Sequence, residues 1–112
     1  MTHEALLAWL AASAPEPPAE LAERLRTAVT AVDLSAAEGI PDALAEAAFA
    51  ALDRASASGR RDQDVAADLL VADALITYAL EAQAARAPGA LEEFSTELAR
   101  RAGASAPTGA GA

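Results

Sequence analysis

The sequence predicts an all-α fold: a single-domain helical bundle of four main helices plus a short N-terminal helix, with a central hydrophobic fourth helix. Alanine, the strongest helix former, occupies 35 of the 112 positions. Apolar residues recur at spacings of three and four, and none of the five segments that proline and glycine delimit shows the alternation of a strand. We expect the bundle to span residues 1–103 and a disordered tail, rich in alanine and glycine, to follow over residues 104–112.

The first helix is expected between about residues 2 and 12. Thr2 is placed to cap its N-terminus, and Glu4 lies in the first turn. His3, the only histidine, also falls in this turn, which we expect to fray. Such a position suits neither a catalytic base nor a metal ligand. The apolar side of this helix carries Leu6, Leu7, Trp9 and Leu10.

The second helix is expected to begin near Pro18. It has the clearest amphipathic pattern of the chain, because its apolar residues step by four, four and three: Leu21, Leu25, Val29 and Val32. A single turn is expected to follow before Gly39, since Ser35 and Glu38 have the spacing of a capping box.

The segment Asp33-Leu34-Ser35 invites comparison with acyl carrier proteins, which are also small, acidic and helical. Those proteins carry phosphopantetheine on the serine of an Asp-Ser-Leu motif, and the order of residues here is different. The acidic residue that directly precedes the serine in that motif is missing here. Ser35 is therefore predicted to cap a turn or a helix rather than to carry a prosthetic group. We expect no cofactor.

The third helix is expected to start at Pro41 and to end near Ser58 and Gly59. Asp62 is placed to cap the fourth helix, which continues to about Ala87. Large apolar residues fall on every side of this fourth helix, and a helix that is apolar all round is normally surrounded. The other helices, or in part a second copy of the chain, are expected to cover it.

The fifth helix is expected to begin around residues 88–90 and to end at Gly103, after two arginines that suit the negative end of the helix dipole. Its inward residues are Leu91, Phe94 and Leu98.

Charge and composition exclude several classes of function. With 17 acidic residues against 8 basic ones, the net charge of −9 repels nucleic acid and anionic lipid surfaces. The chain has no cysteine, so it forms no disulfide, thiolate metal site or cysteine nucleophile. It lacks the roughly 20 consecutive apolar residues of a membrane span and the basic start of a secretory signal. We expect a cytoplasmic protein that binds neither nucleic acid nor a membrane.

No catalytic residues are expected, because neither a nucleophile-histidine pair, nor the Glu-x-x-His pairs of di-iron bundles, nor a glycine-rich phosphate loop is present. Three aspartates crowd the start of the fourth helix, but calcium sites need six to eight oxygens from a loop, so no metal site is predicted. The first two of them, Asp62 and Asp64, suit the helix dipole, whereas Asp68 lies beyond the first turn. Arg60 and Arg61 are predicted to pair with nearby aspartates rather than to bind an anion.

Asp73 places a carboxylate on an apolar face of the fourth helix, with Thr77 one turn further on. It is either a buried acid with a raised pKa that holds a ligand, or the ion-pair partner of an arginine such as Arg24 or Arg54. The large aromatic residues either form a shared core cluster or line an apolar ligand pocket: Trp9, Phe49, Tyr78 and Phe94.

We therefore expect a small protein without catalysis that acts as a protein-interaction or homo-oligomerising module, with a homodimer as the simplest form. The alternative is a helical bundle that binds a small molecule or acyl group in an apolar pocket, with these binding residues: Asp73, Thr77, Tyr78 and Trp9. A filled core with an exposed apolar patch favours the first function, and a wide internal cavity favours the second.

Overall fold

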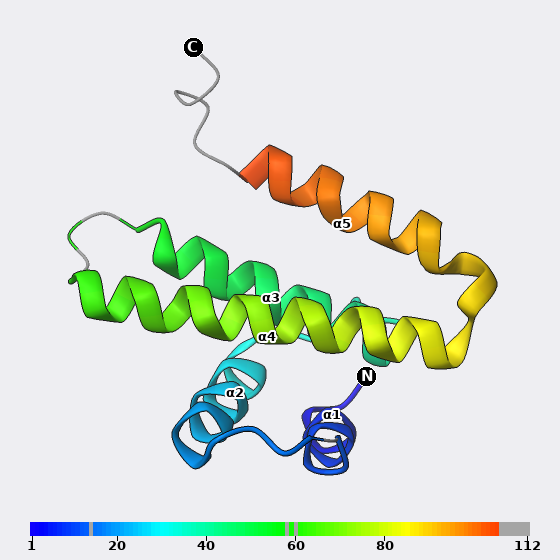
Figure 1. Ribbon diagram of the computed structural model, residues 1–112, viewed down its shortest axis with the longest axis horizontal. Coiled ribbons are helices and arrows are strands. Elements are labelled where there is room, and N and C mark those ends of the chain that lie inside the picture. The colour runs from blue at the N-terminus through cyan, green and yellow to red at the C-terminus, as the bar shows by residue number, and fades with distance from the viewer. Residues whose placement is uncertain (14, 58, 60, 106–112) are drawn as a thin grey trace.

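Figure 1 shows the computed structural model, which describes residues 1–13, 15–57, 59 and 61–105. Within these residues the chain forms five α-helices and no strand, which confirms the predicted all-α single domain. The elements are α1 (His3–Ala11), α2 (Ala19–Ala31), α3 (Ile40–Ala55), α4 (Asp62–Arg86), a 3₁₀ turn (Pro88–Ala90) and α5 (Leu91–Ser105).

The centre of the molecule is the antiparallel pair of α3 and α4 (Figure 1). On one side of this pair α1 and α2 cross it, and on the other side α5 runs back along it. The helix α4 contacts α2, α3 and α5. It therefore has the central position predicted for the fourth helix, although one of its sides stays uncovered.

The main core lies where α1, α2 and the turn after α2 meet the α3–α4 pair. Alanines line much of it, and because each projects a single methyl group, the helices pack closely: Ala43, Ala47, Ala48, Ala51, Ala72, Ala79 and Ala82. Its largest completely buried side chains are Leu6, Val29, Leu34, Leu44 and Leu75. Within the described part of the chain no polar or charged residue is buried.

A second, smaller cluster joins α5 to the pair. Ala45 and Phe49 of α3 and Leu98 of α5 are buried together, and Phe94 packs against them. Trp9 and Tyr78 instead pack against the main core. Phe94 packs against the main core as well, so the large aromatic residues form two groups that Phe94 connects, rather than one tight cluster.

Some helix ends differ from the prediction. Arg61, not Asp62, occupies the N-cap of α4, and α3 already ends at Ala55. In the loop between them Gly59 has a φ of 80°, a conformation that glycine adopts without strain. The helix α5 continues through Gly103 to Ser105, because an isolated glycine lowers helix stability without preventing a helix. Arg60 and the predicted tail beyond residue 105 lie outside the described residues.

Several hydrogen bonds hold the turn after α2, among them one from the Ala37 N–H to the Leu34 carbonyl oxygen at 3.1 Å. The Ser35 backbone N–H donates to Asp33 Oδ1 at 2.9 Å, so Asp33 caps this turn in place of the predicted Ser35. This bond is the main reason why the pKa of the Asp33 carboxyl is lowered. His3 Nε2 donates to the Val32 carbonyl oxygen at 2.6 Å, so this bond ties the first turn of α1, which was expected to fray, to the end of α2. Thr2 caps α1 as predicted, with its hydroxyl oxygen accepting from the Ala5 N–H at 3.1 Å.

Candidate functional site

The four residues predicted to bind a ligand lie on two sides of α4 and do not form one site. The rings of Trp9 and Tyr78 meet edge to face, with centroids 6.0 Å apart and planes at 81°. Asp73 and Thr77 are exposed, and the Thr77 hydroxyl donates to the Asp73 backbone carbonyl at 3.0 Å. At 3.6 residues per turn, Tyr78 is rotated by about 140° around the helix from Asp73.

Neither predicted environment of Asp73 is present. The side chain is exposed rather than buried, and the two arginines proposed as its partners pair elsewhere. Arg24 pairs with Glu20 at 3.8 Å, and Arg54 Nε lies 3.6 Å from Asp68 Oδ1. Among the described residues no cation lies within ion-pair distance of the Asp73 carboxylate. The prediction assumed that α4 is surrounded, and the side that carries Asp73 is the one left uncovered.

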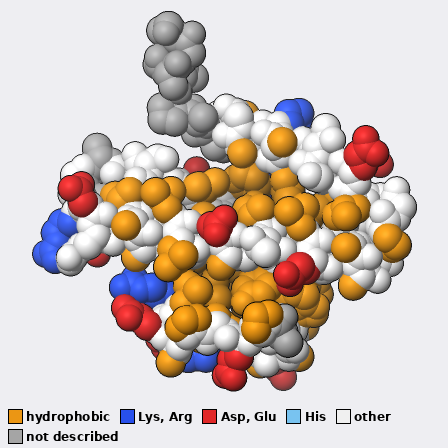
Figure 2. Space-filling model, viewed as in Figure 1, with side chains coloured by type: hydrophobic (Ala, Val, Ile, Leu, Met, Phe, Trp, Pro, Cys, Tyr) orange, Lys and Arg blue, Asp and Glu red, His pale blue; other side chains and the backbone are white. Residues whose placement is uncertain are grey.

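This uncovered side, which we call the outward face of α4, consists of six residues along four turns: Ala66, Leu69, Leu70, Asp73, Thr77 and Glu81. Leu69 is 48% exposed and Leu70 is 52% exposed, and no other large hydrophobic residue of the described part is as open. Figure 2 shows hydrophobic side chains gathered over α4, with acidic side chains standing among them. The outward face is therefore an exposed apolar surface with the carboxylate of Asp73 near its middle and that of Glu81 near its end.

A small cavity lies between α1, α2 and α4, on the side of Tyr78. Its volume is about 160 Å³, and its apolar lining includes Leu7, Leu10 and Leu25. Pockets for drug-sized ligands measure about 300–1,000 Å³, whereas a cavity of about 150 Å³ accepts benzene. The cavity is therefore smaller than most ligand pockets, and the charged residues Glu16 and Arg26 also form part of its lining.

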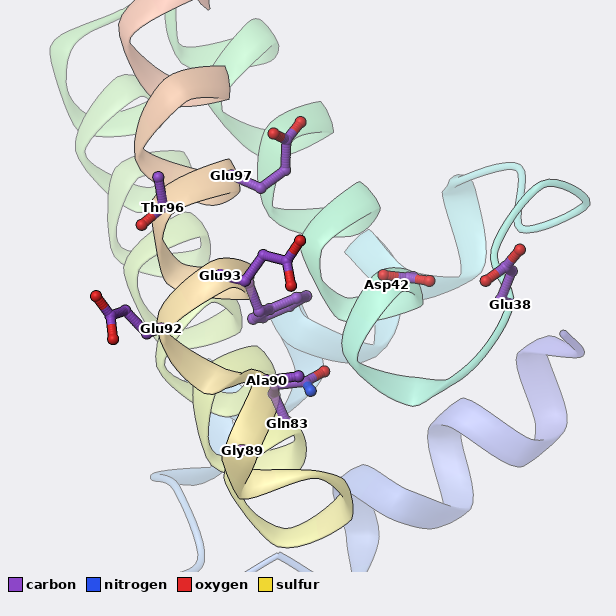
Figure 3. A pocket seen from close by; sticks show the side chains of 10 residues that line it. Glu38, Asp42, Gln83, Gly89, Ala90, Glu92, Glu93, Thr96 and Glu97 are labelled. Atoms are coloured by element: carbon purple, nitrogen blue, oxygen red, sulfur yellow. The ribbon is translucent and has the colours of Figure 1, made fainter.

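A wide, open hollow of about 950 Å³ lies between the beginnings of α3 and α5 (Figure 3). Five carboxylates line it: Glu38, Asp42, Glu92, Glu93 and Glu97. Asp42, Glu92 and Glu93 lie in first turns, where the helix dipole favours a negative charge. Glu97 accepts a hydrogen bond from Arg100 Nε at 3.0 Å, which lowers the pKa of Glu97. The helix starts thus account for most of this acidic lining.

The aspartates at the start of α4 have structural roles. Asp62 and Asp64 lie in its first turn, and Arg61 pairs with Asp64 at 3.9 Å, which confirms the pairing predicted for Arg61. Asp68, which lies beyond the first turn, joins α4 to α3 through Arg54. Over the described part of the chain, no group of acidic and histidine side chains has the arrangement of a metal site.

Arg101 has a role that the sequence pattern did not reveal. Its guanidinium carbon lies 4.2 Å from the centroid of the Phe49 ring, and Nη1 donates to Glu46 Oε1 at 3.0 Å. The pattern at the end of α5 predicts only an interaction with the helix dipole. The two partners lie on α3, about half the chain away, and no local spacing signals such a contact.

When the chain is compared with models of protein families, with curated proteins and with solved structures, nothing matches. No helix in the described residues combines the length and the apolar character needed to cross a membrane.

Proposed function

We propose that the chain is a non-catalytic protein-interaction module whose contact surface is the outward face of α4. The observation that carries this proposal is the pair of half-exposed leucines, Leu69 and Leu70, on a helix whose other large apolar residues are at least partly covered. Covering the open halves of both leucines contributes on the order of 2 kcal/mol to binding. Folding alone does not provide this free energy, because both side chains stay about half exposed in the folded chain.

The rest of the molecule supports an interaction role. The core below the outward face is filled, and α4 is fixed to α3 along its length. A rigid helix that presents apolar residues one turn apart, as Ala66 and Leu70 are, is a common way to bind a second helix. The partner is either another protein or a second copy of this chain.

A photo-crosslinking amino acid tests this proposal. Placed at Ala66 in the full chain and expressed in the source cells, it should form an adduct of defined mass with another polypeptide. The same group at Thr30, an exposed position on α2, is the control and should form none. The adduct should disappear when Leu69 and Leu70 are both changed to serine, because both side chains are already open and the fold does not depend on them.

Circular dichroism and thermal melting of the Leu69→Ser/Leu70→Ser variant check that the fold survives. Equal adducts from Ala66 and Thr30, or adducts that persist without the leucines, would show that the outward face is not the contact surface.

The small cavity favours a second candidate function, the binding of a small apolar molecule. Tyr78 forms part of its wall, and the ring of Trp9 lies against Tyr78. Since Trp9 is the only tryptophan, its fluorescence reports directly on this region. A saturable change of that fluorescence on adding benzene, lost in a Leu10→Phe variant that fills the cavity, is the expected result. An unchanged spectrum at saturating benzene rejects this function.

A further inference from the structure

Asp73 lies between the two exposed leucines when α4 is viewed along its axis. At 100° per residue, Asp73 is rotated by about 40° from Leu69 and by about 60° from Leu70. A chain that covers both leucines therefore also covers Asp73. Because no cation of the described residues pairs with this carboxylate, covering it without a new partner costs several kcal/mol. The partner must bring a positive charge to this position.

A second copy of the chain cannot meet this requirement through the same face. Along the outward face every charged residue is acidic, with Asp73 near the middle and Glu81 near the end. Arg61 precedes α4 and already pairs with Asp64. Two chains of net charge −9 also repel each other. The charges of the outward face therefore favour a different molecule of opposite sign.

We propose that the partner of the outward face is a basic amphipathic helix, an inference that rests on the proposed function. Apolar side chains of this helix pack against Ala66, Leu69 and Leu70. One of its arginines or lysines pairs with Asp73, and a second one, about two turns away, reaches Glu81. The separation follows from the step of eight positions from Asp73 to Glu81, which corresponds to about 12 Å of helix.

Such a complex has a characteristic salt dependence. The net charge of −9 attracts a basic partner over a distance, and dissolved salt screens this attraction. Binding should weaken as salt is added. Self-association of the chain would strengthen instead, because salt screens the repulsion between equal charges.

The test uses a synthetic amphipathic peptide of about five helical turns, with leucines on one face and lysines along its edges. A scrambled peptide of the same composition is its control, since it keeps the charge and loses the apolar face. Fluorescence anisotropy of labelled peptides measures both affinities against the full chain. We expect the amphipathic peptide to bind at least about tenfold more tightly than the scrambled one.

Variants of the full chain locate the contact. Leu69→Ser/Leu70→Ser leaves the charge unchanged and should weaken binding about thirtyfold, which corresponds to the covered halves of two leucines. Asp73→Asn should weaken it about tenfold and reduce its salt dependence. The matched control Glu4→Gln removes the same charge from α1 and should change the affinity less than twofold.

Equal binding of the two peptides, or equal effects of Asp73→Asn and Glu4→Gln, would overturn the basic-helix proposal, since attraction would then depend only on total charge. Sedimentation equilibrium and the crosslink at Ala66 separate this failure from that of the proposed function. If the crosslink at Ala66 captures a second copy of the chain, and sedimentation shows a dimer that becomes tighter as salt is added, the proposal of a basic helix is overturned. The proposal of an interaction module then still holds. Loss of every position-specific adduct at Ala66 overturns both.

Discussion

The helices α3 and α5 both pack against α4, but they are held by different interactions. The contact between α3 and α4 runs along both helices and is lined by alanines such as Ala47 and Ala79, with Leu44 and Leu75 completely buried. By contrast, α5 has no completely buried large side chain: Leu98 is buried but still 7% exposed, and the remaining anchors are more open.

An ion pair also joins α3 to α4, with Arg54 Nε 3.6 Å from Asp68 Oδ1, but it adds to an extensive apolar contact. No charged residue is buried in the core that joins α3 and α4 within the described part of the chain. The helix α5 depends on Arg101, which reaches across to Phe49 and Glu46. The comparison shows that small residues can build an extensive contact between two helices, whereas a helix with few apolar residues needs a long charged side chain to complete its attachment.

The largest effect is expected in the main core. Leu75→Ala removes a completely buried side chain and leaves a cavity that the small neighbouring alanines cannot fill. The free energy of unfolding should fall by about 3 kcal/mol, measured by urea denaturation. Leu70→Ala on the same helix is the control and should cost less than about 1 kcal/mol, because Leu70 is half exposed. Similar losses in the two variants would contradict the packing described here.

The next effect comes from enlarging an alanine of the same contact. Ala47 is completely buried, so Ala47→Leu must push α3 and its neighbours apart. We expect a loss of about 1–3 kcal/mol in urea denaturation. Ala57→Leu, at an exposed position after α3, is the matched control and should leave the stability within about 0.5 kcal/mol. An unchanged stability of Ala47→Leu would mean that α3 and α4 are not closely packed.

A smaller loss of stability, confined to α5, is expected when the contacts that attach α5 to α3 are removed. Arg101→Ala removes both the contact with the Phe49 ring and the bond to Glu46, at a cost of about 1 kcal/mol. Amide hydrogen exchange should accelerate in α5 and stay unchanged in α3 and α4. Arg100→Ala is the control, because Arg100 pairs with Glu97 on the exposed side of α5 itself. Equal acceleration in all helices would show that α5 does not open separately.

The smallest effect is a pH dependence confined to α5. The hydrogen bond from Arg100 lowers the pKa of Glu97, so the folded state favours the ionised carboxylate. The stability that this provides is fully present above the ordinary glutamate pKa of 4.5 and is lost as the pH falls through the lowered value. Acidification below pH 4.5 should therefore loosen the end of α5 before it affects the core of α3 and α4.

Amide exchange at a series of pH values measures this loosening. Glu97→Gln should make α5 less sensitive to acid over the same range. If the wild-type and Glu97→Gln chains respond identically, then Glu97 is not the group responsible.

The sequence predicted the positions of the helices better than it predicted which residues of different helices contact one another. Local signals such as the cap Thr2, Pro18 before α2 and Pro41 in the first turn of α3 act within a few residues, so the helices could be located closely. Contacts between distant residues, such as Arg101 with Glu46 or His3 with Val32, depend on how the helices cross. Periodicity fixes which face of a helix a residue occupies, but it does not identify what that face touches.

The candidate site illustrates the same limit. The pattern of α4 correctly placed Asp73 among leucines, and a helix that is apolar all round was expected to be covered on every side. Only the arrangement of α1, α2 and α5 shows which side stays open. Trp9 and Tyr78 were predicted to share one binding site with Asp73 and Thr77. In the structure Trp9 and Tyr78 pack against the main core, on another side of α4 from Asp73.

The alanine lining of α3 and α4 also sets which substitutions the chain tolerates over generations. At a position such as Ala47 or Ala79, most of the single-base changes that replace alanine introduce a bulkier or a charged side chain, and only glycine and serine remain small. The exposed positions of α5 and α2 accept far more residues. Sequences descended from a common ancestor with this chain should therefore diverge most on their outer helices and keep a strip of small residues along the central pair.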